Sequence, residues 1–208
     1  MKQLVILCHL KNEKLDEVIW AHLSQIYEKY KINVEFRNLH KLNFNPIMNV
    51  EDITAAEKGT VQEDIRIEQE YIAESDYLIF VYPIWPTGIP ALLKGYIDRV
   101  FTEGFAYSVS DDGSLKKFLK KKKVVLVNLV DQRTKLYEND LINSLTACEK
   151  HIFESFGMEI VLQFFLEIPT HERELETLKV RLEDLKQEIK KTMVLSRNSR
   201  LSIPNIFF

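Results

Sequence analysis

A stiff, aromatic loop is the part of this sequence whose residue types most directly indicate a binding surface. The stretch "VYPIWPTGIP" starts as an apolar run and is then interrupted by prolines, a tryptophan and a glycine. The residues that interrupt it are Pro83, Trp85, Pro86, Thr87, Gly88 and Pro90. A minimal polar turn would need far fewer special residues. The loop therefore suits a flat, apolar ligand, and the alternative is a rigid turn that starts a helix.

Two further loops contain residues that could complete such a site. "CHLKNEKLD" brings His9 and Lys14 to the start of a helical pattern, where backbone N–H groups and the positive end of the helix dipole suit an anion. An ordinary helix start is the alternative, because Glu13 and Asp16 oppose an anion there. "LVDQRTKLY" ends on Tyr137, which is either a hydrogen-bond donor to a ligand or a structural aromatic residue.

Apolar runs and helical spacings alternate along the chain, and these elements must position the three loops. We expect strands at "QLVILC", "INVEFRNL", "DYLIFVY", "KVVLVNLV" and "MEIVLQFFLEI". Helical spacing of apolar residues occupies residues 15–30, 61–74, 90–100, 137–156 and 172–191. "HKLNFNPIMNVEDIT" lacks sustained periodicity and is expected to be a long surface connection, and the stretch around "SVSDDGSL" is expected to be irregular.

This alternation predicts an α/β fold. Continuous apolar strands are typical of a parallel sheet that is buried on both faces, so we expect a three-layer sandwich with five parallel strands and helices on either side. The flavodoxin-like strand order 2-1-3-4-5 fits five such strands. In this fold ligands bind beyond the carboxyl ends of the strands, where the order reverses. All three loops follow strands and would meet at that edge.

The composition indicates one globular domain and excludes several classes of partner. The chain has 208 residues, of which 46% are hydrophobic and 28% charged, which suits a single domain over residues 1–208 with residues 192–208 as a C-terminal tail. The net charge of -3 gives no reason to expect nucleic acid. The first apolar run is too short to span a bilayer.

Cysteine and histidine usage points to the cytoplasm and away from a metal site. Cys8 and Cys148 make no disulfide framework and suit a reducing compartment, so we expect a cytoplasmic protein. The five histidines have no close ligand spacing, and neither cysteine has a plausible base beside it in the sequence. We therefore expect neither a metal site nor a cysteine nucleophile.

The central loop and its flanks resemble a known family, the flavodoxin-like NAD(P)H:quinone oxidoreductases. The family includes DT-diaphorase, modulator of drug activity B and the ancillary flavoproteins of glutathione-gated potassium efflux. The best-matching segment is "YPIWPTGIPALLKGYIDRVFTEGFAY", with weaker matches in "LCHLKN" and "LNFNPIMNVEDI". The resemblance implies a bound flavin (FMN or FAD), NAD(P)H as electron donor and a quinone or similar planar acceptor. It also implies ping-pong hydride transfer through the flavin N5 and a homodimer.

The resemblance further implies roles for individual residues. The flavin platform maps to Pro83, Ile84, Trp85, Pro86, Thr87 and Gly88, and the phosphate end of the flavin maps to His9, Lys14, Leu15 and Asp16. Tyr137 falls where the family has a tyrosine that donates a hydrogen bond at the ring edge. Trp85 would line the acceptor slot. Phe105 and Tyr107, from the "FAY" element at the homodimer interface, would help to line the slot of the partner subunit, and the alternative for Phe105 is a core aromatic residue under a long loop.

Two loops depart from the family pattern. The first keeps His9 and lacks the hydroxyl residues that usually follow it, and the third has no glycine and places Asn143 near the family's histidine position. Without glycine the backbone approaches a ring less freely. These departures favour the alternative of a regulatory or ancillary subunit, for example of a potassium-efflux transporter, with weak or lost redox activity. The intact platform and the "FAY" element favour the enzyme.

Overall fold

The computed structural model describes residues 2–9, 13–30, 32–85, 88–131, 139–168, 175–195 and 205–206. The strands of the main sheet are β1 (Lys2–Leu7), β2 (Asn33–Asn38), β3 (Tyr77–Pro83), β6 (Lys123–Asp131), β7 (Glu159–Ile168) and β8 (Asn205–Ile206). A separate hairpin comprises β4 (Tyr107–Val109) and β5 (Leu115–Lys117). The helices are α1 (Glu13–Tyr30), α2 (Val50–Glu57), α3 (Glu63–Glu74), α4 (Ala91–Val100), α5 (Asn139–Ser155) and α6 (Leu175–Leu195).

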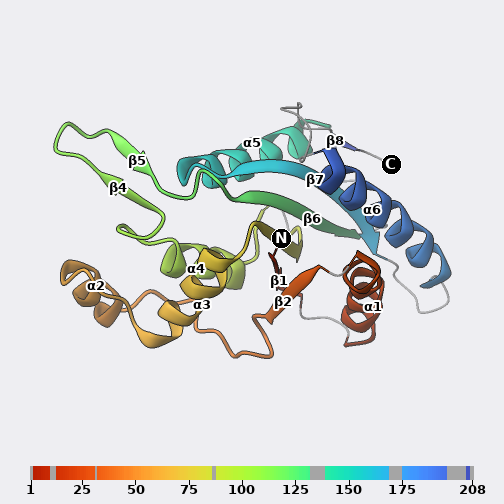
Figure 1. Ribbon diagram of the computed structural model, residues 1–208, viewed down its shortest axis with the longest axis horizontal. Coiled ribbons are helices and arrows are strands. Elements are labelled where there is room, and N and C mark those ends of the chain that lie inside the picture. Colours follow the sequence, from red (N-terminus) through yellow and green to blue (C-terminus); the bar gives the residue numbers. More distant parts are fainter. Residues whose placement is uncertain are drawn as a thin grey trace.

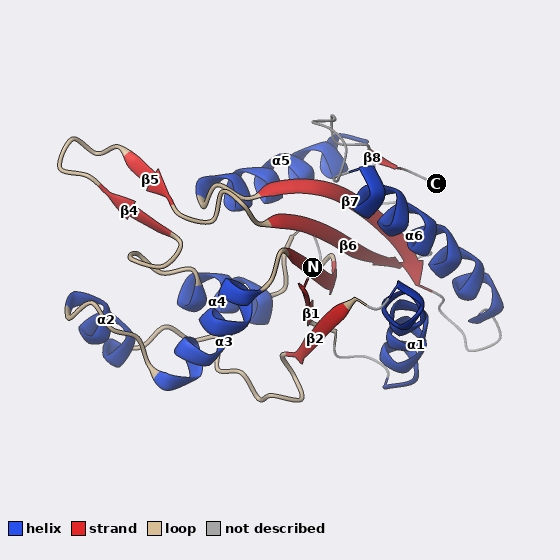
Figure 2. Cartoon of the chain, viewed as in Figure 1, coloured by secondary structure: helices blue, strands red, loops and turns tan. Residues whose placement is uncertain are grey.

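The main sheet has the order β2-β1-β3-β6-β7-β8, and all of its strand pairs are parallel (Figures 1 and 2). Its first five strands have the predicted flavodoxin-like order 2-1-3-4-5, which is confirmed. The order reverses between β1 and β3, because the chain adds β2 on one side of β1 and β3 on the other. β8 adds a short sixth strand beside Gln163 and Phe164, within the segment expected to be a tail.

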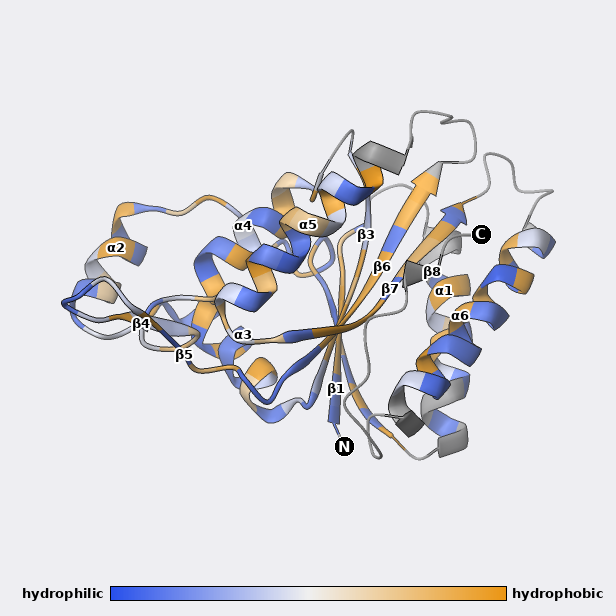
Figure 3. Cartoon of the chain, turned by 90° about the horizontal axis from the view of Figure 1, so that it is seen from above, coloured by the Kyte–Doolittle hydropathy of each residue, from blue (hydrophilic) through white to orange (hydrophobic). Residues whose placement is uncertain are grey.

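Helices cover both faces of this sheet. Successive side chains of a strand point to opposite faces. On one face, residues such as Phe80 form a buried cluster with α3, α4 and α5, and on the other face residues such as Ile79 pack with α1 and α6. Figure 3 shows the apolar strands between these two helical layers. In the described part of the chain no helix is long and apolar enough to cross a bilayer.

The connection from β2 to α3 contains a helix that the sequence did not predict. Asn49 and Asp52 form a reciprocal cap at the start of α2: the Asp52 N–H donates to Asn49 Oδ1 at 2.9 Å, and the Asn49 N–H donates to Asp52 Oδ2 at 3.1 Å. All residues of α2 stay at least partly exposed. The predicted surface position was right, and the helix was missed because it has no buried apolar stripe.

This connection is held against α4 by a glycine and an arginine. A Cβ atom on Gly95 would lie 2.2 Å from the carbonyl oxygen of Pro46, so only glycine lets the two backbones approach this closely. The buried Arg99 donates two hydrogen bonds to the Asp52 carboxylate, at 2.8 and 2.9 Å, and one to Asp64 at 2.9 Å. These contacts fix the helix that follows the aromatic loop.

Candidate functional site

The carboxyl ends of β1, β3 and β6 meet at one edge of the sheet. Beyond the end of β1, the Cys8 N–H donates to the Val81 carbonyl at 2.9 Å. Beyond the end of β3, the Ile84 N–H donates to the Leu129 carbonyl at 3.0 Å. These bonds carry the sheet one residue past each strand. As a result the first and second candidate loops leave the sheet side by side, at the point where the strand order reverses.

The described part of the aromatic loop is anchored at its base and open at its tip. Pro83 and Ile84 are buried, and Ile84 packs with Val130 and Leu145. The Trp85 N–H donates to the Gly88 carbonyl at 3.1 Å and so closes the loop, while the Trp85 side chain is 47% exposed. Pro86 and Thr87 lie outside the described residues.

Gly88 has an open side. In the described part of the chain, nothing lies within 4 Å of the position that a Cβ atom would take, and its backbone is not in the left-handed region. Neither a turn nor internal packing therefore requires glycine at this position. A flat ligand lying on the loop would require it, because a side chain would occupy the space beside the backbone. These residues therefore fit the predicted flavin platform.

The first loop places one predicted residue at the edge and leaves the others partly undefined. His9 follows β1 and is buried. Lys14, Leu15 and Asp16 lie in the first turn of α1, so their backbone is at a helix N-terminus as predicted, and their side chains are outside what the structure describes. The neighbouring Cys8 is a neutral thiol, since burial raises its pKa to about 12.

Residues 132–138, which make up most of the third loop, lie outside the described residues. β6 ends at Asp131 and α5 begins at Asn139, so the loop that contains Tyr137 starts and ends at elements that flank the edge. The role of Tyr137 stays a prediction. Asn143 lies in the first two turns of α5.

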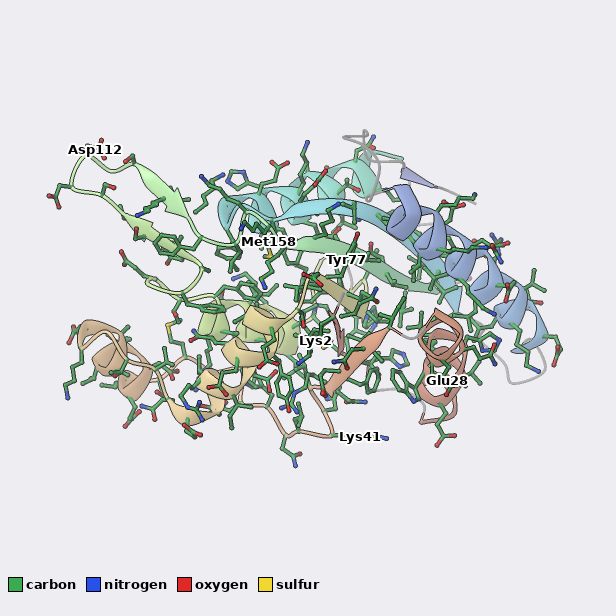
Figure 4. The ribbon with its side chains drawn as sticks, viewed as in Figure 1. Lys2, Glu28, Lys41, Tyr77, Asp112 and Met158 are labelled. Carbon is green, nitrogen blue, oxygen red and sulfur yellow. The ribbon has the colours of Figure 1, made fainter. Side chains whose placement is uncertain are left out.

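Phe105 and Tyr107 lie at the other end of the sheet from the aromatic loop. The intervening helix α4 has 10 residues and is therefore about 15 Å long. Tyr107 stacks on Phe156, which follows the C-terminus of α5, with ring centroids 6.0 Å apart. In Figure 4 the hairpin tip, marked by Asp112, projects away from the sheet on the side of Met158, which directly precedes β7. Within one chain these aromatic residues do not meet Trp85, so their predicted role requires a second copy.

A groove of about 330 Å³ lies between α4 and α5 beside the aromatic loop. The residues that line it are Gly88, Ile89, Lys94, Ser144, Leu145, Cys148, Glu149 and Ile152. Its size is at the lower end of the range for small-molecule sites. The groove is mainly apolar, and it contains one carboxylate, that of Glu149, which the sequence analysis did not single out.

Glu149 belongs to a buried polar network below the groove, in which all four side chains are at most 1% exposed. Tyr82 Oη and Asn128 Nδ2 donate to Glu149 Oε1, at 2.6 and 3.0 Å. Gln163 Nε2 donates to Glu149 Oε2 at 2.6 Å and to Asn128 Oδ1 at 3.0 Å. One carboxylate from α5 thus joins β3, β6 and β7.

The groups that donate hydrogen bonds to Glu149 are neutral, so none of them brings a positive charge to offset the effect of burial on its pKa. Burial raises the pKa of Glu149, and the hydrogen bonds from Tyr82, Asn128 and Gln163 oppose that shift. Burial and the neighbouring carboxylate together raise the pKa of Tyr82 well above its usual value. The second buried glutamate, Glu68, instead pairs with the guanidinium of Arg37.

Comparison with known proteins identifies the family. The family described as flavodoxin-like fold matches residues 1–189. The chain belongs to this family. A curated relative from Haemophilus influenzae, named an uncharacterized NAD(P)H oxidoreductase, is 34% identical over 163 residues, which cover 77% of this chain and 81% of the relative. The predicted resemblance is confirmed.

Solved structures share the fold of this chain. The NAD(P)H:quinone oxidoreductase from Methanothermobacter marburgensis has a TM-score of 0.76 and 21% identity, with coverage of 91% of this flavodoxin-like chain and 98% of that one. An FMN-dependent NADH-azoreductase from Bacillus anthracis, solved in complex with FMN, has a TM-score of 0.62 and 17% identity, with coverage of 90% and 98%. At these identities the likeness supports the fold.

The sequence of this family member did contain a signal for the Glu149 network. On α5, Glu149 lies four residues after Leu145 and four before Phe153, both of which are buried, so it occupies a position of the apolar stripe. Asn128 and Gln163 likewise interrupt apolar strand runs. Polar residues at core positions usually hydrogen-bond to one another.

Proposed function

We propose that this chain is a flavin-dependent NAD(P)H:quinone oxidoreductase. The observation that carries the proposal is the aromatic loop at the sheet's carboxyl edge, in which the Trp85 side chain is exposed and Gly88 has an open side. That arrangement suits a flat ring system lying on the loop. The names of the relatives, NAD(P)H oxidoreductase and NAD(P)H:quinone oxidoreductase, support the same reaction class.

Each group of residues has a binding or orienting role in this proposal. Pro83 and Ile84 hold the loop against the sheet, and Trp85 and Gly88 offer the surface for the ring. His9 and the N-terminus of α1, with Lys14 in its first turn, are assigned to the phosphate end. When bound, the flavin supplies the hydride-transfer chemistry at N5. Either FMN or FAD satisfies this assignment, and the FMN bound to the azoreductase favours FMN.

The acceptor side of the site is assigned to two chains. We place a quinone or similar planar acceptor against Trp85, with Phe105 and Tyr107 of a second copy closing the slot. A homodimer is needed because these two residues lie at the far end of their own sheet. Donor and acceptor then use one slot in turn, in a ping-pong cycle. We place this enzyme in the cytoplasm.

A reconstitution experiment tests the proposal. The purified protein is titrated with FMN and FAD separately, and we expect one or both to be retained, with the absorbance band of an oxidised flavin near roughly 450 nm. The loaded protein should then oxidise NAD(P)H in the presence of a benzoquinone, and double-reciprocal plots at several quinone concentrations should be parallel. Absence of flavin binding with either cofactor would refute the proposal and favour a regulatory or ancillary subunit.

A further inference from the structure

The buried polar network lies next to the carboxyl ends of β3 and β6. Tyr82 immediately precedes Pro83, where the aromatic loop leaves the sheet, and Asn128 lies on β6 three residues before its end at Asp131. We propose that Glu149 is a positioning residue for the aromatic loop of the flavin site: by accepting hydrogen bonds from β3, β6 and β7, it sets that loop in its binding arrangement before a ligand arrives. The inference rests on the proposed function, since it assigns Glu149 to the same site.

The chemistry of the network requires a carboxylate. Three donors converge on two oxygens, at 2.6, 2.6 and 3.0 Å. A carboxylate accepts all three, because each oxygen has two lone pairs. A glutamine at position 149 has one acceptor oxygen, and its NH₂ group would face a donor. One of the three strands would therefore lose its bond to α5.

A packing path connects Glu149 to the aromatic loop. Leu145 lies one turn earlier on the same face of α5 and packs against Ile84 and Val130. Ile84 is the residue that holds the base of the loop to the sheet, through its bond to Leu129. A shift of α5 would thus move Leu145 and the surface on which Ile84 rests. Glu149 also lines the groove that Gly88 borders.

Glu68 provides a matched control. It is as deeply buried as Glu149 and lies on the same side of the sheet, and it accepts hydrogen bonds from Arg37 and from Tyr96 Oη. Its partners come from β2 and α4, and its hydrogen bonds involve residues outside the aromatic loop. Replacing Glu68 should therefore disturb the core without displacing that loop.

The experiment uses the loop's own tryptophan as a reporter. The chain has two tryptophans, so Trp20→Phe leaves Trp85 as the single tryptophan. Trp20 packs on Phe36, and a phenylalanine at position 20 keeps an aromatic contact there. In this background, Glu149→Gln should weaken FMN binding at least tenfold. In flavin-free protein it should also change the emission maximum and the iodide quenching of Trp85. Glu68→Gln should leave FMN affinity within twofold and Trp85 emission unchanged.

Exchanging the side chains at positions 149 and 163 tests whether the complete hydrogen-bond network, and not Glu149 alone, controls FMN affinity and Trp85 emission. In the double variant Glu149→Gln/Gln163→Glu, the amide oxygen at position 149 accepts from Tyr82 and Asn128, and its NH₂ group donates to the carboxyl group at position 163. Because burial favours the neutral form of that carboxyl group, its O–H donates to Asn128 Oδ1, and every group is again satisfied. The exchange should restore FMN affinity to within about threefold of the parent and restore Trp85 emission.

Several outcomes would overturn the inference. One is a Glu149→Gln protein that melts at a lower temperature and keeps its FMN affinity and Trp85 emission. Another is an exchange variant that regains thermal stability while its FMN affinity stays low. If Glu149→Gln does not fold, Tyr82→Phe removes a single donor and should change both readouts in the same direction by a smaller amount. If the parent binds no flavin, the proposed function fails, and Trp85 emission in flavin-free protein still decides the positioning role.

Discussion

Replacing Arg99 by methionine should destabilise the protein strongly, because it removes the guanidinium that holds the β2–α3 connection to α4. The Arg99 side chain is 3% exposed and contacts the Asp52 and Asp64 carboxylates, of which Asp52 is 12% and Asp64 49% exposed. Breaking a fully buried pair costs about 3–5 kcal/mol. Water reaches both carboxylates in the variant, Asp64 most easily, so the expected loss of unfolding free energy is about 3 kcal/mol.

Thermal unfolding measures this loss, and pH gives a second check. For a chain of this length 1 kcal/mol corresponds to roughly 2–4 °C, so the melting midpoint should fall by about 6–12 °C. The hydrogen bonds from Arg99 hold the pKa of Asp52 below its usual value. The Arg99–Asp52 pair therefore contributes its full stability at pH values above the ordinary carboxyl pKa. That contribution is lost as the pH falls through the lowered pKa of Asp52 in the folded protein. The difference between parent and variant should narrow below about pH 4.

Arg66→Met is the matched control. Arg66 also pairs with two carboxylates, those of Glu63 and Glu70, and its side chain is 47% exposed. Exposed ion pairs contribute little, so its loss should leave the midpoint unchanged within error. Equal effects of the two substitutions, or an Arg99→Met effect that is the same at pH 3 and pH 7, would refute the reasoning.

Three further changes test the loops and the helix packing. Gly95→Ala should lower the denaturation midpoint, because the clash with Pro46 costs about 1–3 kcal/mol and outweighs a gain of up to about 1 kcal/mol in helix propensity; a higher midpoint would contradict this. Gly88→Val should leave the flavin-free midpoint unchanged and weaken FMN binding about tenfold by titration, because its open side then becomes occupied; unchanged affinity would count against the platform. Lys14→Glu should weaken FMN binding by about 1–3 kcal/mol in a salt-dependent manner and spare riboflavin, which has no phosphate; equal effects on both ligands would remove Lys14 from the phosphate site.

The sheet could be predicted from the sequence because its strands are buried on both faces. A run such as "DYLIFVY" is apolar throughout and does not alternate with polar residues. This is the pattern of a strand whose two faces are both covered by helices. Helix α2 could not be predicted in this way, because its stability comes from the Asn49–Asp52 cap and the bonds to Arg99. Arg99, which bonds to Asp52 of that cap, lies 47 residues after it in the sequence.

The candidate site was predictable where it depends on topology. His9 and the aromatic loop lie at the same edge of the sheet because parallel strands end there, which follows from strand order alone. The separation of Trp85 and Tyr107 follows from the same topology, because a helix that connects two parallel strands runs antiparallel to them and carries the chain back to the other end of the sheet. The Glu149 network was missed because each of its polar residues is a single interruption of an apolar pattern in the sequence, and only the tertiary fold brings Tyr82, Asn128 and Gln163 to one carboxylate.

The same network bears on how the chain folds while it is being synthesised. Tyr82 and Glu149 are separated by 67 residues. At roughly 5–20 residues per second, Glu149 is therefore added about 3–13 s after Tyr82. During that interval the buried hydroxyl of the central strand has no carboxylate to bond, and β3 lacks its neighbour β6 for much of it. The nascent N-terminal half thus presents an open strand edge, which gives other nascent chains or chaperones time to bind it.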